Sequence, residues 1–199
     1  MISAVILAAG ESKRMGQPKM LLPWGEVTVL GQVISTYQAA GVQDVLVVTG
    51  GARGQVEGIV HQHGARSVFN EQFAGGGMLS SLQCGLRQLL STEEAEVEAA
   101  LIGLGDQPQV QAGAVRQVCE AFQQRSARLI VPSFQMRRGH PWLVERSLWK
   151  ELLELQPPQS PRDFLNRHAE EIMYVECENS SILADLDTPQ DYRNSRPDP

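Results

Sequence analysis

Hydrophobic residues occur in two patterns along the chain, and the two patterns alternate. Short continuous apolar runs, typical of strands buried on both faces of a sheet, cover residues 5–7, 45–48 and 99–104. Between the first two runs, residues 29–40 place apolar side chains at a helical spacing, and Gly41 supplies a helix end. Strands and helices alternating in this order indicate right-handed βαβ units. We therefore expect an α/β fold around a largely parallel sheet.

The same patterns predict elements along the rest of the chain. Strands are expected over residues 44–49, 67–69, 98–104, 128–132, 171–176 and 181–187, and helices over residues 29–40, 55–63, 78–90, 112–124, 147–155 and 162–168. Thr188, followed by proline and an acid, predicts the start of a last helix. We expect one domain over residues 1–193 and a polar, proline-rich tail over residues 194–199.

Composition and charge exclude several classes of protein. Hydrophobic content of 42% and charged content of 20% are ordinary for a globular protein, and no apolar run approaches the roughly 20 residues that span a membrane. The start of the chain lacks a basic lead and a cleavage site, so we expect a cytoplasmic protein without a membrane partner. A net charge of -6 offers no basic face for nucleic acid. Three widely spaced cysteines indicate neither a disulfide framework nor a zinc site.

The first strand leads directly into a loop rich in glycine and positive charge. Small residues come first, and a hydroxyl, cations and a second glycine follow: Ala8, Ala9, Gly10, Ser12, Lys13, Arg14, Gly16 and Lys19. Backbone N–H groups, glycines that accept positive φ and fixed cations together suit a polyphosphate. The loop therefore predicts a binding site for a nucleoside triphosphate.

Two common phosphate loops do not fit this stretch. The P-loop requires four residues between its glycines, whereas five separate Gly10 from Gly16. The dinucleotide fingerprint G-x-G-x-x-G is broken at Ser12. In residue order and spacing the stretch resembles the signature L-A-A-G-x-S-x-R-M-G-x-x-K of nucleotidyltransferases related to the molybdenum cofactor guanylyl- and cytidylyltransferases.

This resemblance extends over residues 2–25, 70–86, 103–108, 137–142 and 183–192. It implies a single three-layer α/β/α domain with a Rossmann-like, GT-A-like nucleotidyltransferase fold. The implied reaction is a Mg²⁺-dependent transfer of CMP from CTP to the terminal phosphate of molybdopterin, with release of pyrophosphate. A molybdoenzyme that receives the product is an implied protein partner.

The acidic candidates lie in the second half of the chain. Asp106 follows a predicted strand, at the edge where open α/β sheets bind ligands. Aspartate before a nearby proline also closes turns, which is the simpler alternative for Asp106. Asp185 and Asp187 alternate along the strand predicted over residues 181–187, which would place both carboxylates on one face. We expect Asp185 near the metal and Asp187 as a cap for the last helix.

The resemblance implies roles for particular residues. Arg14, Lys19 and Asp106 would be catalytic, with the two cations on the β- and γ-phosphates and with Asp106 and Asp185 on Mg²⁺. The nucleotide would contact Leu7, Ala8, Ala9, Gly10, Ser12, Arg14, Lys19, Asn70, Gly77, Ser81 and Asp106. Arg138 and His140 would face the acceptor, although an orienting hydrogen bond is an equal alternative for His140.

The base and the acceptor are argued from fewer positions. L-A-A-G resembles the cytidylyltransferases, whereas the guanylyltransferases more often show L-A-G-G, and the methyl group of Ala9 leaves less room beside the base. This favours CTP. Residues 134–137 depart from the glycine-rich turn that is common in the family, which leaves the acceptor pocket open. A transferase using GTP or another phosphorylated acceptor, and a non-catalytic carrier of the finished cofactor, stay as alternatives.

Overall fold

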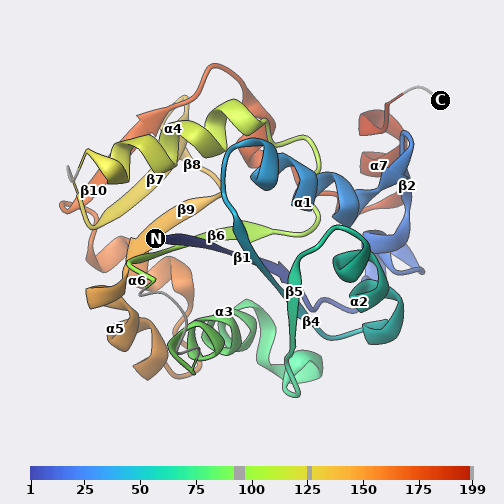
Figure 1. Cartoon of the computed structure of the whole chain (residues 1–199), viewed down its shortest axis with the longest axis horizontal. Helices are drawn as coiled ribbons and strands as arrows, with labels where there is room; N and C mark the ends of the chain where they lie inside the picture. The colour runs from blue at the N-terminus through green and yellow to red at the C-terminus, as the bar shows by residue number, and fades with distance from the viewer. Residues whose placement is uncertain (92–96, 125–126, 198–199) are drawn as a thin grey trace.

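An eight-stranded sheet forms the centre of the computed structural model, which describes residues 1–91, 97–124 and 127–197. The strands follow the order β10-β7-β9-β6-β1-β4-β5, and β8 pairs with β7 (Figure 1). Their bounds are β1 (Ile2–Ala8), β4 (Asp44–Thr49), β5 (Arg66–Phe69), β6 (Ala99–Leu104), β7 (Leu129–Phe134), β8 (Arg137–Arg138), β9 (Trp142–Glu145) and β10 (Ile172–Glu176). A separate small ribbon joins β2 (Pro23–Trp24) to β3 (Val27–Thr28).

Helices cover both faces of the sheet, as the α/β/α prediction requires. One layer contains α1 (Val29–Ala39), α2 (Arg53–Gln62) and α4 (Ala112–Gln123), and the other contains α3 (Phe73–Ser91), α5 (Trp149–Glu154) and α6 (Pro161–Arg167). The last helix, α7 (Pro189–Ser195), lies beside β2 (Figure 1). Within the described ranges, no helix has the length and apolarity needed to cross a membrane.

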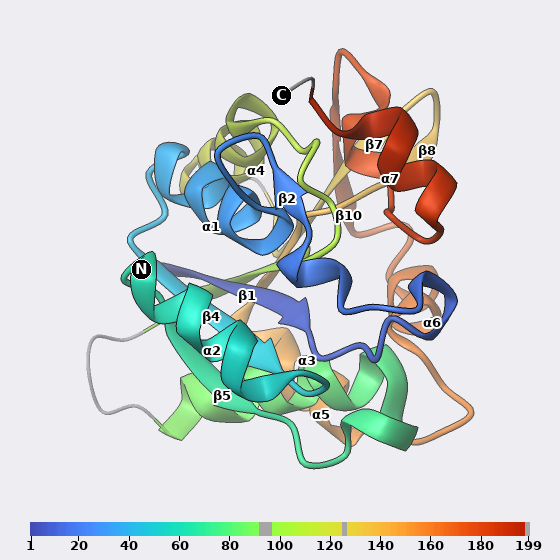
Figure 2. The ribbon, with the colours of Figure 1, turned by 90° about the vertical axis from the view of Figure 1, so that its right-hand side faces the viewer.

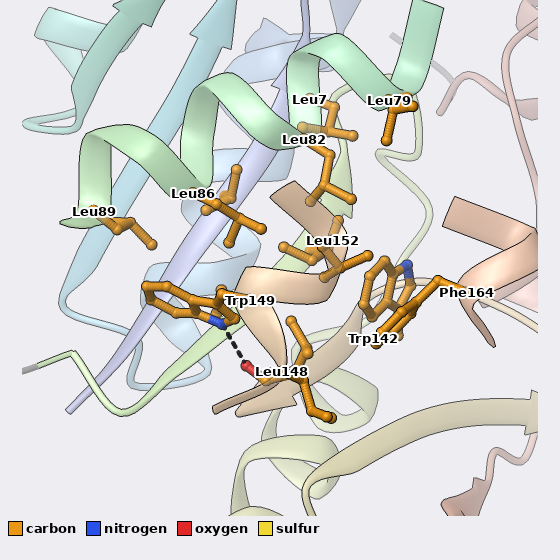
Figure 3. Packing of buried hydrophobic residues seen from close by; sticks show 14 of the residues in the cluster. Leu7, Leu79, Leu82, Leu86, Leu89, Trp142, Leu148, Trp149, Leu152 and Phe164 are labelled. Atoms are coloured by element: carbon orange, nitrogen blue, oxygen red, sulfur yellow. Dashed lines mark hydrogen bonds between the residues drawn. The ribbon is translucent and has the colours of Figure 1, made fainter. Parts of the chain in front are cut away.

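Strand β1 illustrates why the sheet is buried on both faces. Val5 and Leu7 pack into the cluster that contains α3, α5 and α6, whereas Ala4 and Ile6 pack into the cluster on the opposite face. Successive side chains of a strand point to opposite faces, so a continuous apolar run is the pattern that such a position requires. Figure 3 shows leucines along one side of α3 facing the side chains of α5, α6 and β9. The central strand is therefore held rigidly where it enters the loop.

The sheet is mostly parallel, but it contains one central strand that the sequence patterns did not predict. β6, β1, β4 and β5 pair in parallel, whereas β9 runs antiparallel between β6 and β7. Residues 142–145 form this strand, where the sequence predicted only a connection to the next helix. The stretch is four residues long, which is too short for its periodicity to distinguish it from a loop.

The strand predicted over residues 181–187 is wrong. Residues Ser180–Leu183 form a 3₁₀ helix, η4, and the following residues extend without a strand partner. The Asn179 side chain accepts the N–H of Ser181 at 3.0 Å, which favours a turn over a strand. The main chain of the segment instead bonds to loops: Ile182 O accepts from His140 N at 3.0 Å, and Leu186 N donates to Asp106 O at 3.2 Å. At the C-terminus, α7 includes residues 194 and 195, which the sequence assigned to the tail.

A histidine with two acidic partners joins α5 and α6 to the start of β10. His168 Nδ1 lies 2.8 Å from Glu171 Oε1, and His168 Nε2 lies 2.7 Å from Glu151 Oε2. Burial favours the neutral ring, but the hydrogen bonds to these two carboxylates outweigh it and raise the pKa of His168. A ring that faces a carboxylate on each nitrogen is best satisfied as the doubly protonated cation.

We predict that this cluster makes stability depend on pH. Because the pKa of His168 is raised in the folded state, its contribution is fully present below the unfolded value of about 6.5 and is lost as pH rises through the folded pKa. Urea unfolding from pH 5.5 to 8.5 should show wild type losing stability relative to His168→Gln across that window. A constant difference between the two proteins would contradict the assignment.

Candidate active site

Lys19 and Asp106 meet at the centre of the site. The Lys19 ammonium, at the start of η2 (Lys19–Leu21), pairs with Asp106 Oδ2 and donates to Leu186 O at 3.2 Å. The two side chains are 12% and 16% exposed, so the pair is shielded from much of the solvent's screening. One lysine thus joins the loop after β1, the turn after β6 and the C-terminal segment.

The parallel pairing of β1 and β6 brings these segments together. Both strands end at the same edge of the sheet, with Leu7 opposite Leu104. The next residue, Gly105, donates its N–H to Leu7 O at 3.0 Å. A Cβ at this position would lie 3.0 Å from Ala8 Cβ and 3.1 Å from Met20 Sδ, so a glycine allows the turn to cross close above β1. Asp106 is thereby placed beside the loop.

The loop is shaped by two residues in the left-handed region. Ser12 has φ 52° and Gly16 has φ 68°, and they bracket the short 3₁₀ helix η1 (Lys13–Met15). The Ser12 hydroxyl accepts the N–H of Lys19 at 3.1 Å, so this predicted nucleotide contact also ties the loop to itself. The N–H groups of Gly10, Glu11 and Ser12 donate to no group in the described part of the chain. Free N–H groups beside cations suit a polyphosphate.

The three residues that precede Gly10 are buried. Leu7, Ala8 and Ala9 are 8%, 1% and 5% exposed, and the Leu7 side chain belongs to the core against α3. Their side chains are therefore occupied by packing, so a nucleotide would meet chiefly their backbone. Gly10 itself is open, since no atom lies within 4 Å of the place where a Cβ would be.

Asp187 pairs with the second cation of the loop, which corrects its predicted role as a helix cap. Asp187 Oδ2 accepts from Arg14 at 3.0 Å, and its Oδ1 lies 3.7 Å from the Lys19 ammonium. The cap of α7 is Thr188, whose side chain and that of Asp191 form a reciprocal capping box. Thr188 bonds lower the pKa of Asp191. Both predicted phosphate-binding cations are thus paired with aspartates in this structure.

Asp185 lies at the rim of the same group of charges. Its Oδ1 accepts from Gln107 Nε2 at 2.7 Å. Although Asp185 is exposed at the rim, partial burial of its carboxyl raises its pKa, and the carboxylates of Asp106 and Asp187 raise it further, against the hydrogen bond from Gln107 and the charge of Lys19. Negative charge is therefore in excess around Asp185, which is a condition that favours a bound cation.

A small apolar cluster holds the C-terminal segment against the loop. It consists of Met15, Leu22, Trp24, Val29 and Leu186, with Tyr192 packed against it. The Tyr192 hydroxyl also donates to Pro23 O at 2.6 Å. Figure 1 and Figure 2 agree in placing the red helix α7 next to the blue segment that contains β2. The last helix therefore closes the site from outside the sheet.

The predicted nucleotide wall lies where α3 begins, and its polar groups bond to one another. Asn70 Nδ2 donates to the hydroxyls of Ser80 and Ser81 at 2.9 and 3.2 Å, and both hydroxyls donate to Gly77 O. Gly77 has φ 59° and ψ −155°, which interrupts the helix at this point. Asn70 is 4% exposed and Ser81 is 5% exposed. This network fixes the kink at the start of α3.

The two predicted acceptor residues occupy different environments. Arg138 on β8 donates to the Tyr174 hydroxyl at 2.9 Å and to Asn166 Oδ1 at 2.8 Å. Burial lowers the pKa of His140 to about 4, so its ring is neutral at pH 7. Gly139 allows this stretch to touch the C-terminal segment, because a Cβ there would lie 2.5 Å from Ile182 O. The stretch therefore lies next to the segment that carries Asp185.

The aspartates fit a divalent metal that also binds the substrate. Within the described ranges, no three His, Cys, Asp or Glu side chains form a ready metal-binding group. Mg²⁺ is commonly held by one or two carboxylates and completes its coordination with waters and substrate phosphates. Asp106 and Asp185 are oxygen donors of this kind beside a loop with free N–H groups, so the donor set suits such an ion.

A loop with free backbone N–H groups and cations, next to aspartates at the carboxyl edge of an α/β/α sheet, is the arrangement expected of a nucleotidyltransferase domain. Residues 4–172 match the MobA-like NTP transferase domain, and the chain belongs to this family of nucleotidyltransferases. It is thus an enzyme of the transferase class, as the sequence motifs implied.

Individual relatives cover nearly the whole chain. The molybdenum cofactor cytidylyltransferase of Escherichia coli is 28% identical over 96% of this chain and 93% of its own. The nicotine blue oxidoreductase of Paenarthrobacter nicotinovorans is 26% identical over 94% of this chain and 92% of its own. A Mycobacterium tuberculosis protein solved as a complex with manganese has a TM-score of 0.78 and 26% identity, and the match covers 97% of this chain and 96% of that one.

Replacing Asn70 should test the network at the start of α3. Asn70→Ala leaves Ser80 and Ser81 without their buried donor, and we expect unfolding free energy to fall by about 1–3 kcal/mol. Urea unfolding of the variant measures this loss. Gln38→Ala, which removes an exposed side-chain bond to His63 O, is a control that should change stability far less. Equal losses in the two variants would show that the Asn70 network has no special role.

Proposed function

We propose that the protein transfers CMP from CTP to the terminal phosphate of a molybdopterin cofactor and releases pyrophosphate, with Mg²⁺ as the metal. The observation that carries this proposal is the contact of Lys19 with Asp106, which joins the phosphate loop to the acidic turn. A triphosphate on the loop would therefore lie within reach of a metal on the aspartates. The match to the Escherichia coli cytidylyltransferase over nearly the full length of both chains supports the substrates.

The cations of the loop would exchange partners when the substrate binds. Arg14 and Lys19 are held by Asp187 and Asp106, and phosphate oxygens can replace those carboxylates. The exchange releases the aspartates, and Mg²⁺ bound there would neutralise charge that develops on the α-phosphate and on the leaving pyrophosphate. The free N–H groups of Gly10, Glu11 and Ser12 would orient the triphosphate. Catalysis by these residues consists of alignment and charge stabilisation.

The acceptor would approach from the side of Gly139 and His140. His140 is neutral, so its ring would orient an acceptor group by hydrogen bonding rather than bind phosphate as a cation. Arg138 is already bonded to Tyr174 and Asn166, and an acceptor phosphate would compete with those neutral partners for its guanidinium. A molybdoenzyme that receives the product is the protein partner that we propose.

Removing the Asp106 carboxylate should abolish the reaction without unfolding the protein. Asp106→Ala deletes a metal ligand while Lys19 keeps Leu186 O as a partner, so we expect pyrophosphate release from CTP, Mg²⁺ and molybdopterin to fall at least about 100-fold. Asp44→Asn, at the opposite end of the sheet and ion-paired with Arg66, is the matched control and should keep full activity. Wild-type turnover by Asp106→Ala would support a non-catalytic carrier instead.

Ala9 should set the preference for the base. A thermal-shift titration with Mg²⁺ compares CTP with GTP, because a ligand that binds the folded state raises its stability. We expect a larger shift with CTP in wild type, and a gain in the shift with GTP in Ala9→Gly, because removing the buried methyl group lets the backbone beside the base move toward the core. Ala8→Gly, on the opposite face of β1, is the control. A larger shift with GTP in wild type would favour the guanylyl alternative.

A further inference from the structure

Gln107 is the buried residue next to Asp106, and it reaches across to the C-terminal segment. It is 3% exposed, and its Nε2 donates to Asp185 Oδ1 at 2.7 Å. We propose that Gln107 is a positioning residue that fixes the Asp185 carboxylate for the divalent cation. This role deepens the proposed function and rests on it, because it assigns the hydrogen bond a purpose in metal binding.

The two partners differ in how firmly the fold holds them. Gln107 belongs to the tight turn after β6, where its N–H donates to Leu104 O at 3.4 Å and its carbonyl accepts from Val110 N at 3.3 Å. Asp185 lies between η4 and α7, on backbone that belongs to no helix or strand. The side chain of Asp185 is also exposed at the rim of the site. Gln107 therefore restrains an exposed side chain that no other hydrogen bond holds within the described part of the chain.

An amide suits this task for an electrostatic reason. A lysine or arginine at position 107 would neutralise Asp185 and compete with the metal, whereas a neutral N–H donor fixes the carboxylate and leaves its charge. Oδ1 accepts the bond from Gln107, and Oδ2 accepts none within the described part of the chain. One oxygen is thus held in place while the other is available to a cation.

The amide oxygen of Gln107 indicates that a contribution to stability alone does not explain why a glutamine stands at this position. Its Oε1 is buried and accepts no hydrogen bond from the described residues, which is unfavourable for the folded state. Turning the amide over would place that oxygen against the Asp185 carboxylate, which is worse. The bond to Asp185 therefore determines the orientation of the side chain, at the expense of an unpaired acceptor.

The test compares Gln107→Leu with Gln109→Leu. The first removes the donor and the unpaired oxygen together. The second removes only an unpaired oxygen, because Gln109 Oε1 is likewise buried without a partner in the described chain. Binding of Mn²⁺ to the protein is measured by electron paramagnetic resonance with and without CTP, in the absence of an acceptor, and thermal unfolding is measured in EDTA. We expect Gln107→Leu to bind Mn²⁺ about 10-fold more weakly or worse, with an unchanged or higher Tm, and Gln109→Leu to bind as wild type does.

Each other outcome overturns part of the proposal. Wild-type Mn²⁺ binding by Gln107→Leu removes the positioning role, and so does a weaker binding that comes with a lower Tm in both Gln107→Leu and Gln107→Met. Gln107→Met keeps the length of the side chain, so it replaces the leucine variant if that one fails to fold. A wild type that binds no Mn²⁺ either with or without CTP removes the metal site itself. If the Gln107 effect appears but CTP is not turned over, only the proposed reaction fails.

Discussion

The ion pair between Lys19 and Asp106 is the contact on which the rest of the site depends. It joins two loops that are 87 residues apart in the chain, and the same ammonium also binds the C-terminal segment through Leu186 O. An ion pair shielded from solvent stabilises only when further partners satisfy its atoms, and here Leu186 and Asp187 supply them. The strands place the two loops at one edge of the sheet, and the lysine then sets the distance between phosphate loop and acidic turn.

Charge balance explains how the site can be stable without a ligand and still be suited to bind a metal complex of a triphosphate. Lys19 and Arg14 face Asp106 and Asp187, so each cation has an acidic partner before any substrate binds. Asp185 has only a neutral hydrogen-bond partner, and partial burial together with the neighbouring carboxylates raises its pKa. The proposed metal complex of a triphosphate would bring positive charge to the aspartates and negative charge to the cations, so it would satisfy both sets at once. Either component alone would leave one set unpaired.

Much of the fold could be predicted from the sequence because most strands are continuous apolar runs and most helices have clear ends. β4 was predicted at its observed bounds, and the capping box of α7 follows from Thr188. β9 was not predicted because four residues are too few to show a strand periodicity. In the stretch 181–187, apolar Ile182, Ala184 and Leu186 alternate as in a strand, yet no neighbouring strand pairs with it.

The contact of Lys19 with Asp106 could be expected from the sequence, because both residues lie in motifs that predicted one shared nucleotide site. The pairing of Arg14 with Asp187 depends on a fold that joins residues 173 apart, and no local pattern encodes it.

The irregular backbone of residues 184–188 follows from what this segment must contact. In a paired strand, the N–H and C=O of Leu186 would form hydrogen bonds with a neighbouring strand. Here the N–H donates to Asp106 O and the C=O accepts from Lys19. The Leu186 side chain is fully buried in the cluster beneath the loop, so both flanking aspartates extend away from that cluster toward the charged groups. Such a segment needs anchors at its ends, since no sheet holds it. η4 with its contact to Gly139 supplies one anchor, and α7 with the Tyr192 bond to Pro23 supplies the other.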